Sequence, residues 1–396
     1  MKLFLIKIGK VFSQLKNIGI FGTSKKIFAA LYLMISPAGS GDVLFITNGT
    51  GDSARYRNWN VAEELKIHGF KCAVTLQDNF WLLGSAKKFK IFIFHRVVYN
   101  PKIAEFIAKI KKQGGEIIFE TDDLTFDPQY IIKTDNYSKL NALERKQYAG
   151  GLGLEILQDP YVKICTTTTT YLAKILEGYS KKVFVVSNKL SNEDIKITEK
   201  NNHSKLIQNS KFKIQNFIRI GYFSGTKSHD RDFATVTDAL LNIMEKYPAV
   251  RLVLAGPLNT ENSLNKFKSR IKCLPYAGRK KHFENIAGVD INIVPLEIGD
   301  PFCESKSELK FFEAGILEVP TVAAATQTFQ EAILDGEDGF IASSSEDWIV
   351  KIEKLILDKK LREEMGGKAR EKALQKYTTK NSGNEDYYNF LKNRIK

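Results

Sequence analysis

The chain has 396 residues, 43% hydrophobic and 26% charged, which indicates a globular protein of two domains with large cores. Lysine and arginine outnumber aspartate and glutamate by 59 to 45, so the net charge is +14 and the expected partners are anionic: phosphorylated small molecules, an acidic membrane surface or nucleic acid. The four cysteines are scattered without a C-x-x-C pair, so neither a disulfide framework nor a zinc site is indicated, and free thiols in a reducing cytosol are predicted.

Residues 1–40 form a distinct basic segment that contains lysines but no acidic residue. Apolar residues recur there at helical spacing and most lysines lie off that stripe, which is typical of an amphipathic helix on an anionic membrane face. A helix packed on the protein's own core is the alternative. No apolar stretch reaches the roughly 18 residues of a membrane-spanning helix, and the lysines are spread too evenly for a cleaved signal peptide.

From residue 42 apolar strands alternate with amphipathic helices. Strands are predicted at 42–47, 71–76, 90–95, 116–121, 161–167 and 182–187. This alternation is typical of an open, parallel α/β sheet. The polar stretch 191–216 has no sustained period and is predicted to be a linker.

A second α/β series follows, with strands predicted at 218–223, 251–256, 290–296, 320–325 and 339–343. We interpret the chain as two Rossmann-like, doubly wound domains that face a central cleft, one over 41–190 and one over 217–375. Residues 376–396 are predicted to be a C-terminal helix that packs back on the N-terminal domain. Because doubly wound sheets place ligands at the carboxyl ends of their strands, sites are expected in the loops after strands.

The loop after the first strand, "NGTGDSARYR", contains small and basic residues. Gly49 and Gly51 allow close backbone approach, and Arg55 and Arg57 bring positive charge to the following helix. This is a weak signal for phosphate binding, because the full G-x-G-x-x-G pattern is absent. A tight turn is the alternative.

Two later strands of the first domain also end on polar residues. "FHRVV" supplies His95 and Arg96, and a lone histidine is more often structural than catalytic. "ETDDL" supplies Asp122 and Asp123. Paired carboxylates can bind a metal, accept hydrogen bonds from sugar hydroxyls or cap a helix, and capping is the commonest of these roles.

The second domain opens with "IGYFSGTKSHDRDF", in which Gly225 follows the strand. Lys227, His229 and Arg231 crowd the turn before a helix. Cations at a helix N-terminus make a good anion site, and a solvated charged turn is the alternative.

The stretch "ESKSELKFFEAG" at 304–315 reads as the start of a helix. Ser305 and Glu308 have the spacing of a capping box, with Ser305 as N-cap. Glu313 then falls in the middle of the apolar face. A buried carboxylate requires hydrogen-bond donors, which either an internal ion pair or a ligand could supply.

The same stretch suits a nucleotide. Backbone amides around Lys306, Ser307 and Glu308 could hold a diphosphate at the helix tip, helped by the Lys306 ammonium. Glu313 would then lie close enough to accept hydrogen bonds from ribose hydroxyls.

On these motifs the chain resembles the GT-B glycosyltransferases, and specifically glycosyltransferase family 4 (the group 1 transferases), over roughly residues 42–375. "SKSELKFFEAG", "VPTVAAA" and "QEAILDGEDGF" are similar to the second half of the family's E-x7-E motif and the segments after it. Glu313 matches the second glutamate, which in the family holds the donor's ribose. "SARYR…AEEL…G" also resembles the start of bacterial cell-surface polysaccharide transferases.

The sequence departs from the family at two motifs. The first glutamate's position, eight residues before Glu313, is occupied by Ser305, with Glu304 beside it. In the family's G-R-x4-K clamp, Thr226 replaces the arginine with Lys227 adjacent, and Arg231 replaces the lysine. The resemblance assigns to the donor side Gly225, Thr226, Tyr276, Glu304, Ser305, Lys306, Ser307, Glu308 and Glu313.

The resemblance implies transfer of a sugar from a nucleotide-sugar donor with retention at the anomeric carbon, without a metal or other cofactor. Lys227, Arg231 and Glu313 are the expected catalytic residues, the cations neutralising the departing diphosphate. The acceptor is expected against the first domain, near Gly49, Gly51, Arg55, His95, Asp122 and Asp123. A glycan or lipid-linked glycan acceptor in cell-surface polysaccharide synthesis is expected, in the cytoplasm or on the inner face of the plasma membrane.

Two alternatives belong to other classes. A nucleotide-sugar epimerase has the same two-domain layout. A non-catalytic basic protein would bind nucleic acid or membrane. The positive residues concentrate at 1–40 and at two helix starts and are not interleaved with aromatics in one stripe, so no nucleic-acid partner is expected.

Overall fold

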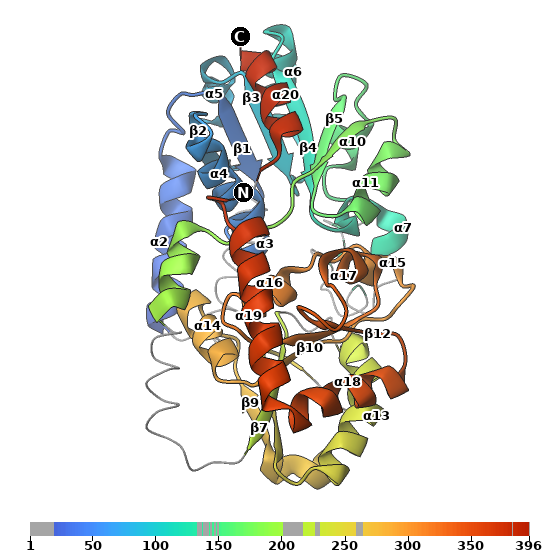
Figure 1. Ribbon diagram of the computed structural model, residues 1–396. Helices are drawn as coiled ribbons and strands as arrows, with labels where there is room; N and C mark the ends of the chain where they lie inside the picture. The colour runs from blue at the N-terminus through green and yellow to red at the C-terminus, as the bar shows by residue number, and fades with distance from the viewer. Residues whose placement is uncertain are drawn as a thin grey trace. The chain divides into compact units, whose positions relative to one another are not determined.

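The computed structural model describes residues 20–132, 137, 142, 145, 148, 150–200, 217–225, 230–258, 264–381 and 383–395. The chain divides into two compact units (Figure 1). Unit 1 comprises Met1–Ser191, Ser305–Ser307 and Ser382–Lys396, and unit 2 comprises Asn192–Glu304 and Glu308–Asn381.

Unit 1 is built on a six-stranded sheet whose strand pairs are all parallel. Across the sheet the strands are β2 (Cys72–Leu76), β1 (Val43–Thr47), β3 (Ile91–His95), β4 (Glu116–Thr121), β5 (Ile164–Thr167) and β6 (Lys182–Val185). The central strands β1 and β3 are buried along their whole length, as expected for a sheet covered on both faces. The strand order reverses between β1 and β3, so the carboxyl ends of these strands form the switch point.

The helices of unit 1 begin where the local sequence favours a start. At α6, for example, the Asn100 side chain accepts a hydrogen bond from the Ile103 amide (3.1 Å) and Pro101 takes the first helical position. The helical segments are α2 (Ile20–Ile35), α3 (Asp52–Ala54), the π-helical η1 (Arg55–Asn60), α4 (Val61–Ile67), α5 (Leu82–Ser85), η2 (Ala86–Lys88), α6 (Pro101–Lys112), η3 (Leu124–Phe126), α7 (Pro128–Ile131), α10 (Leu154–Gln158), α11 (Thr170–Glu177) and α20 (Glu385–Ile395).

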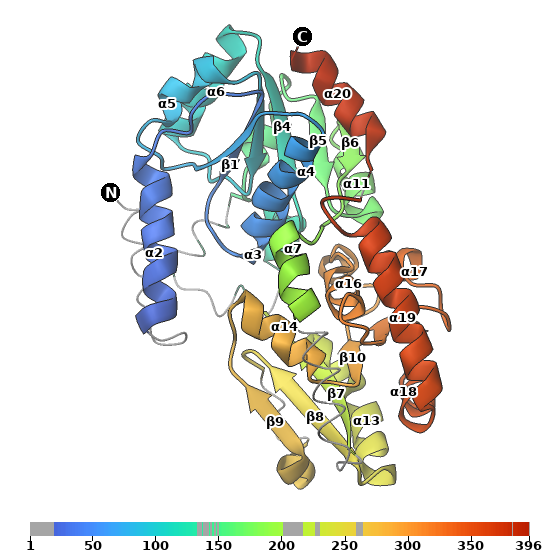
Figure 2. The same ribbon diagram turned by 60° about the vertical axis from the view of Figure 1, so that its left-hand side comes forward.

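Helix α20 comes from the end of the chain and completes the core of unit 1 (Figures 1 and 2). Tyr387, Tyr388 and Leu391 are buried in one cluster with Val43 and other residues of the central strands. The Tyr388 ring stacks on His68 with ring centroids 4.0 Å apart. Its hydroxyl donates to the buried Glu64 carboxylate, which also pairs with Lys189.

Arg57 corrects one sequence expectation, because it does not present charge to a loop. Its side chain is fully buried in η1 and forms two hydrogen bonds to Glu120, at 2.7 and 3.1 Å, and one to the Val186 carbonyl at 2.6 Å. Burial disfavours the guanidinium charge, but Glu120, together with Asp122 and Tyr387, favours it, and the net effect raises the pKa of Arg57. Arg57 therefore ties η1 to the sheet.

Unit 2 has a second six-stranded sheet, again with parallel pairs throughout. Its order is β12 (Phe340–Ala342), β11 (Thr321–Ala324), β10 (Ile291–Val294), β7 (Ile218–Phe223), β8 (Val250–Ala255) and β9 (Ile271–Leu274). The prediction of two doubly wound α/β domains is confirmed. The sequence did not predict β9, because this four-residue edge strand is partly exposed and has no apolar run. The order reverses between β7 and β10, whose carboxyl ends form the second switch point.

The helical segments of unit 2 are α13 (Asp230–Lys246), η5 (Asn265–Arg270), α14 (Arg279–Ala287), α15 (Pro301–Glu304), α16 (Leu309–Gly315), α17 (Gln327–Ala332), α18 (Ser345–Leu357) and α19 (Lys359–Lys376). Residues 192–200, inside the stretch predicted as a linker, are helical and belong to unit 2. The polar composition that suggested a linker there includes Asp194, which is fully buried and accepts a hydrogen bond from Arg279.

Candidate active site

Glu313 lies on α16, beside the unit 2 switch point, with only 4% of its surface exposed. One of its carboxylate oxygens accepts a hydrogen bond from Arg279 Nη1, and the other lies 3.1 Å from His282 Nε2. Both partners come from α14, three residues apart and therefore on one helix face. The sequence correctly required donors for this carboxylate, and the structure contains the internal ion pair that was one of the two alternatives.

Arg279 is fixed from several directions. Its Nε donates to Asp194 at 2.8 Å, and its guanidinium carbon lies 4.3 Å from the centroid of the Phe283 ring. The His282 ring meets Phe223, the last residue of β7, edge-on at 5.9 Å. These contacts hold the Glu313 carboxylate in one place at the end of the sheet.

Arg279 and His282 were not predicted from the sequence. Their spacing and the preceding Gly278 predict only that a basic helix begins there. Nothing local connects Arg279 to a carboxylate 34 residues later, since that contact depends on how α14 and α16 pack.

The predicted capping box is wrong. Helix α16 begins at Leu309 with Glu308 as an N-cap whose side chain makes no capping hydrogen bond, and Ser305 is fully buried before it. The stronger start signal lies upstream, where Asp300 accepts a hydrogen bond from the Cys303 amide at 3.0 Å and Pro301 opens α15. The short helix α15 precedes α16 along the chain and ends at Glu304. The amides around Lys306 and Ser307 therefore lie between the two helices and are not the first turn of α16.

The Glu304 carboxylate connects two backbone segments of unit 2. Its two carboxylate oxygens accept hydrogen bonds from the amides of Gly299 (2.9 Å) and Gln327 (2.8 Å), the latter at the N-terminus of α17. The carboxylate therefore joins the loop after β10 to the helix after β11. Of its neighbours, Lys306 is half-buried, and Ser307 accepts a hydrogen bond from Asn188 Nδ2 at 2.9 Å.

The β7 side of the switch point carries Gly225 and Arg231. Gly225 is exposed in a bend after β7, and a Cβ added there would meet nothing within 4 Å. The Arg231 side chain, 59% exposed in the first turn of α13, pairs with Glu297 at 2.7 Å. Tyr276 is half-buried in the loop between β9 and α14. Thr226, Lys227 and His229, like residues 1–19, lie outside the described residues.

In unit 1 a polar cluster forms at the carboxyl ends of β1, β3 and β4, around the buried His95. His95 Nε2 lies 3.2 Å from both Ser53 Oγ and Asp122 Oδ1, and Ser53 donates to Asp122 Oδ2 at 2.7 Å. Nδ1 lies 2.9 Å from Asn58 Nδ2, whose amide also donates to the Ala54 carbonyl. This partner assignment makes Nδ1 the acceptor and Nε2–H the donor. Because Ser53 and Asp122 contact the same ring nitrogen, the cluster is not a hydrolytic triad.

Arg96 completes this cluster with a backbone φ of 50°, which is rare outside glycine. Its Nε donates to Asp122 at 2.6 Å, and its Nη2 donates to Asp123. Burial alone would raise the pKa of Asp122, but Arg96, with His95 and Ser53, lowers it well below the usual value. An ionised carboxylate of such low basicity suits recognition of hydroxyl or cationic groups better than proton abstraction.

The remaining acceptor-side candidates divide into caps and exposed positions. Asp123 caps η3 by accepting hydrogen bonds from the Thr125 amide (2.9 Å) and hydroxyl (2.5 Å), which is the commonest role of such a carboxylate. A Cβ at Gly49 or Gly51 would meet nothing within 4 Å, so no close backbone contact requires glycine there. Arg55 is half-buried at the start of η1.

Two further properties bear on the chemistry. Among the described residues, no group of three or more His, Cys, Asp or Glu side chains is placed to hold a metal ion. Nor does any described helix combine the length and apolar character needed to cross a membrane.

Residues 218–358 match the family model described as "Glycosyl transferases group 1". The chain carries a group 1 glycosyltransferase domain. No curated protein matches the sequence. The match makes residues 218–358 a glycosyltransferase domain, and the finer assignment to glycosyltransferase family 4 stays a prediction.

Similar solved structures cover both units. A glycosyltransferase from Rickettsia africae is 14% identical with a TM-score of 0.59, over 90% of this chain and 99% of its own. HepE from Anabaena, solved with UDP and glucose, is 12% identical with a TM-score of 0.57, over 86% and 96%. WaaG, a glycosyltransferase involved in lipopolysaccharide biosynthesis, is 15% identical with a TM-score of 0.56, over 88% and 99%. At these identities the likeness shows the GT-B fold.

Proposed function

We propose that this glycosyltransferase moves a sugar from a nucleotide-sugar donor to a glycan or lipid-linked glycan acceptor, with retention of configuration and without a metal, in the synthesis of a cell-surface polysaccharide. The observation that carries the donor side is the Glu313 carboxylate, buried beside the switch point of a group 1 domain. Structures of HepE contain UDP, UDP-glucose, or UDP and glucose, and WaaG acts in lipopolysaccharide biosynthesis, which supports this choice of donor and product class.

The chemistry requires charge stabilisation more than a nucleophile. The bond between the anomeric carbon and the diphosphate oxygen breaks, and the acceptor oxygen bonds to the same face of that carbon. The acceptor proton passes to the departing phosphate oxygen. Lys227 and Arg231, with help from Lys306, neutralise the growing charge, and Glu313 holds the ribose. Arg231 already pairs with Glu297, so the diphosphate must compete with that carboxylate for the guanidinium.

On the acceptor side we assign recognition to the unit 1 cluster. His95 and Asp122 are connected by a contact of 3.2 Å, and Asp122 is ionised at neutral pH because of Arg96. These groups can accept and donate hydrogen bonds to sugar hydroxyls at fixed positions. Gly49, Gly51 and Arg55 belong to the same proposed surface.

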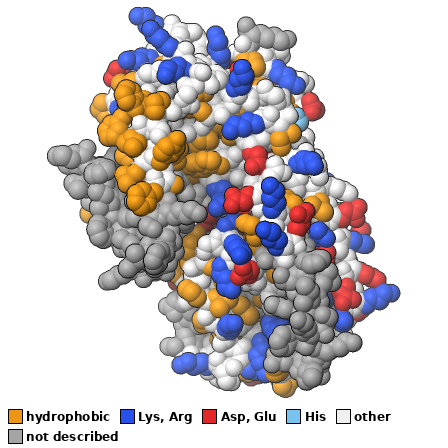
Figure 3. Space-filling model, turned by 90° about the vertical axis from the view of Figure 1, so that its left-hand side faces the viewer, with side chains coloured by type: hydrophobic (Ala, Val, Ile, Leu, Met, Phe, Trp, Pro, Cys, Tyr) orange, Lys and Arg blue, Asp and Glu red, His pale blue; other side chains and the backbone are white. Residues whose placement is uncertain are grey.

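We also propose that the chain works peripherally on the inner face of the plasma membrane through residues 1–40. Within the described part of that segment, Phe28, Tyr32 and Ile35 of α2 are exposed, at 72%, 66% and 56%. Phe80 and Trp81 add to this apolar surface, since the Phe80 amide and the Trp81 indole donate to the carbonyls of Met34 and Ile35. Figure 3, which faces the side that carries α2, shows hydrophobic side chains gathered there.

The deciding experiment is a thermal-shift screen of UDP, GDP, CDP and TDP, each alone and with its sugars. A glycosyltransferase is expected to be stabilised by one nucleoside diphosphate over the others. If none of the nucleotides raises the melting temperature, the donor-site proposal fails. Product analysis with the selected donor then separates transfer from epimerisation, because an epimerase would change the sugar without an acceptor.

A further inference from the structure

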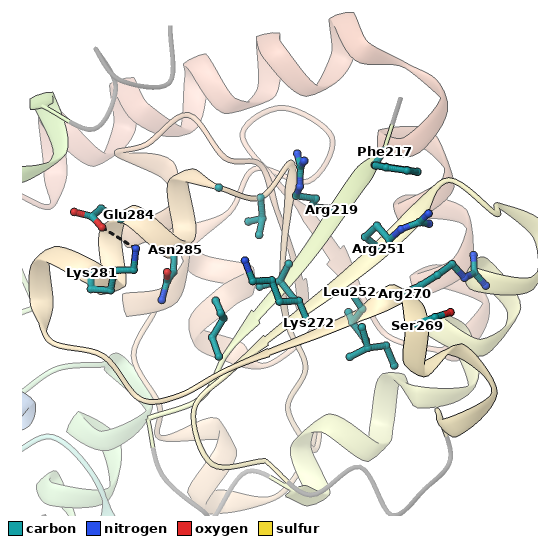
Figure 4. A pocket seen from close by; sticks show the side chains of 15 residues that line it. Phe217, Arg219, Arg251, Leu252, Ser269, Arg270, Lys272, Lys281, Glu284 and Asn285 are labelled. Carbon is teal, nitrogen blue, oxygen red and sulfur yellow. Dashed lines mark hydrogen bonds and ion pairs between the residues drawn. The ribbon is translucent and has the colours of Figure 1, made fainter. Parts of the chain in front are cut away.

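Unit 2 contains a pocket of about 420 Å³ between α14 and strands β7, β8 and β9 (Figure 4). Its lining includes one carboxylate, Glu284, which pairs with Lys281 at 3.0 Å. The cationic side chains in the lining outnumber it and come from five different elements, β7, β8, η5, β9 and α14: Arg219, Arg251, Arg270, Lys272 and Lys281. We call it the amino-end pocket.

The strand register forces these charges together. Arg219 of β7 is the direct parallel partner of Arg251 of β8, so their side chains leave the same face of the sheet side by side. Lys272 of β9 pairs with Val253, which shares that face with Arg251 because side chains alternate along a strand. Like charges on neighbouring strands are destabilising, and no carboxylate on these strands lies between them.

Part of the cluster has a structural use. Arg251 Nη1 donates to the carbonyls of Pro248 (2.7 Å) and Val250 (3.0 Å), and its guanidinium carbon lies 4.0 Å from the Phe217 ring centroid. Arg270 donates to the carbonyls of Tyr247 (3.1 Å) and Met244 at the end of α13. Burial lowers the pKa of Arg270, and the Arg251 charge lowers it further. These contacts fix two guanidinium groups but neutralise neither.

Arg219 and Lys272 have no such explanation. Among the described residues, neither side chain forms an ion pair or a hydrogen bond, although the Arg219 amide donates to Asp290 at 2.8 Å. Backbone capping therefore accounts for Arg251 and Arg270, but leaves two more cations in the same pocket.

The pocket is separate from the proposed donor site. Arg219 and Arg251 are the second residues of their strands, four residues before the carboxyl ends of β7 and β8. At the rise of a β-strand this separation is about 13 Å. Donor residues follow the carboxyl ends, whereas the pocket lies near the amino ends.

We propose that the amino-end pocket binds a multiply charged phosphate compound, either a free oligophosphate or phosphomonoester or the headgroup of a phosphorylated lipid. Guanidinium groups suit phosphate oxygens because their paired N–H groups match two oxygens at once, and the lysines add point charges. Such a ligand neutralises the repulsion that the strand register creates. This site does not depend on the proposed function, because none of its residues belongs to the donor or acceptor machinery.

The test compares wild type with the double variant R219Q/K272Q, which keeps chain length but removes the two otherwise unexplained charges. The matched control is K359Q/K360Q, which removes two exposed lysines from α19 in the same unit. Tripolyphosphate binding is measured by calorimetry with UDP present to fill the donor site. We expect the double variant to bind about tenfold more weakly and the control to match wild type.

A second readout separates binding from folding. Relief of like-charge repulsion is expected to raise the melting temperature of the ligand-free double variant by about 2 °C, while its stabilisation by tripolyphosphate falls below that of wild type. The lipid source is tested with phosphatidylcholine vesicles with and without phosphatidic acid. If wild type and the control variant bind the phosphatidic acid vesicles and the double variant does not, the site is assigned to a lipid headgroup. Unchanged binding of both probes by the double variant overturns the proposal, whereas absence of a UDP shift in wild type overturns only the donor site.

Discussion

Glu313 combines two properties that the sequence could only partly anticipate. Its place on an apolar helix face predicted burial and a need for donors, and both are present. The identity of the donors was beyond local patterns, because Arg279 and His282 reach it through the packing of α14 on α16. The ion pair is a property of the ligand-free protein, whereas the ribose role is a proposal about a bound ligand.

Substituting Glu313 separates these roles. Glu313→Gln retains a hydrogen-bond acceptor for Arg279, and Arg279 keeps Asp194, so we expect a loss of only about 1–2 kcal/mol of stability. The affinity for the nucleoside diphosphate, measured by calorimetry, should fall by at least about tenfold. Arg279→Met is the partner control. If both variants lose similar stability and bind nucleotide like wild type, Glu313 is only half of an internal ion pair.

Asp122 gives a pH dependence whose sign follows from its lowered pKa. The folded state holds the carboxylate ionised while the unfolded state takes up its proton near pH about 4, so unfolding binds a proton and stability falls as pH drops through that region. Asp122→Asn should cost about 2 kcal/mol at neutral pH, in denaturant unfolding of unit 1. The deficit should shrink toward zero in acid. A deficit that is constant with pH would show that the charge is not responsible.

The helices around the switch point show where sequence patterns stop being informative. The apolar face of α16 was predictable from its spacing, but its start was not, because Asp300 and Pro301 open a separate helix four residues earlier than the predicted cap. Strand β9 was likewise absent from the prediction, because a short edge strand needs no apolar run. The close approach of α16 and α19 depends on two small residues, since a Cβ on Gly315 or Gly366 would meet backbone of the facing segment.

Adjacent glycines in α19 provide a matched test of that approach. A Cβ at Gly366 would lie 2.3 Å from the Glu318 carbonyl oxygen, whereas a Cβ at Gly367 would meet nothing within 4 Å. Gly366→Ala should therefore destabilise unit 2 by about 2 kcal/mol, and Gly367→Ala should stabilise it by roughly 0.5–1 kcal/mol through helix propensity. Thermal unfolding measures both. Equal effects of the two substitutions would contradict the packing argument.

For the whole chain, the alternation of strands and helices was sufficient to predict two doubly wound sheets, because parallel sheets require buried strands joined by helices. The sequence also predicted which polar side chains lie in the loops at the carboxyl ends of the strands. Which of those side chains bind a ligand was less predictable: Glu304, Arg57 and Asp123 all serve the protein's own backbone or core, and composition does not distinguish a carboxylate that caps from one that recognises a sugar.

Helix α20 makes unit 1 depend on the end of the chain. Deleting residues 383–395 removes Tyr387, Tyr388 and Leu391 from the core cluster, so we expect unit 1 to unfold while unit 2 keeps its fold. Limited proteolysis should then cut throughout unit 1 and spare the described strands and helices of unit 2. Tyr388→Phe is the mild control, which removes only the hydroxyl that donates to Glu64 and should cost about 1 kcal/mol. A truncated chain that resists proteases like the full one would refute the dependence.

The same helix has a consequence for synthesis on the ribosome. Domains usually fold in the order in which they emerge. Here the first unit to emerge lacks part of its core until the second has been made, because Tyr387 and Tyr388 pack beside β1 and β3 at the opposite end of the chain. Unit 2 can fold first. Unit 1 remains incompletely folded, and therefore accessible to chaperones, until translation ends. A stalled or prematurely terminated chain would therefore carry an incomplete unit 1, which quality control could recognise before the protein becomes active.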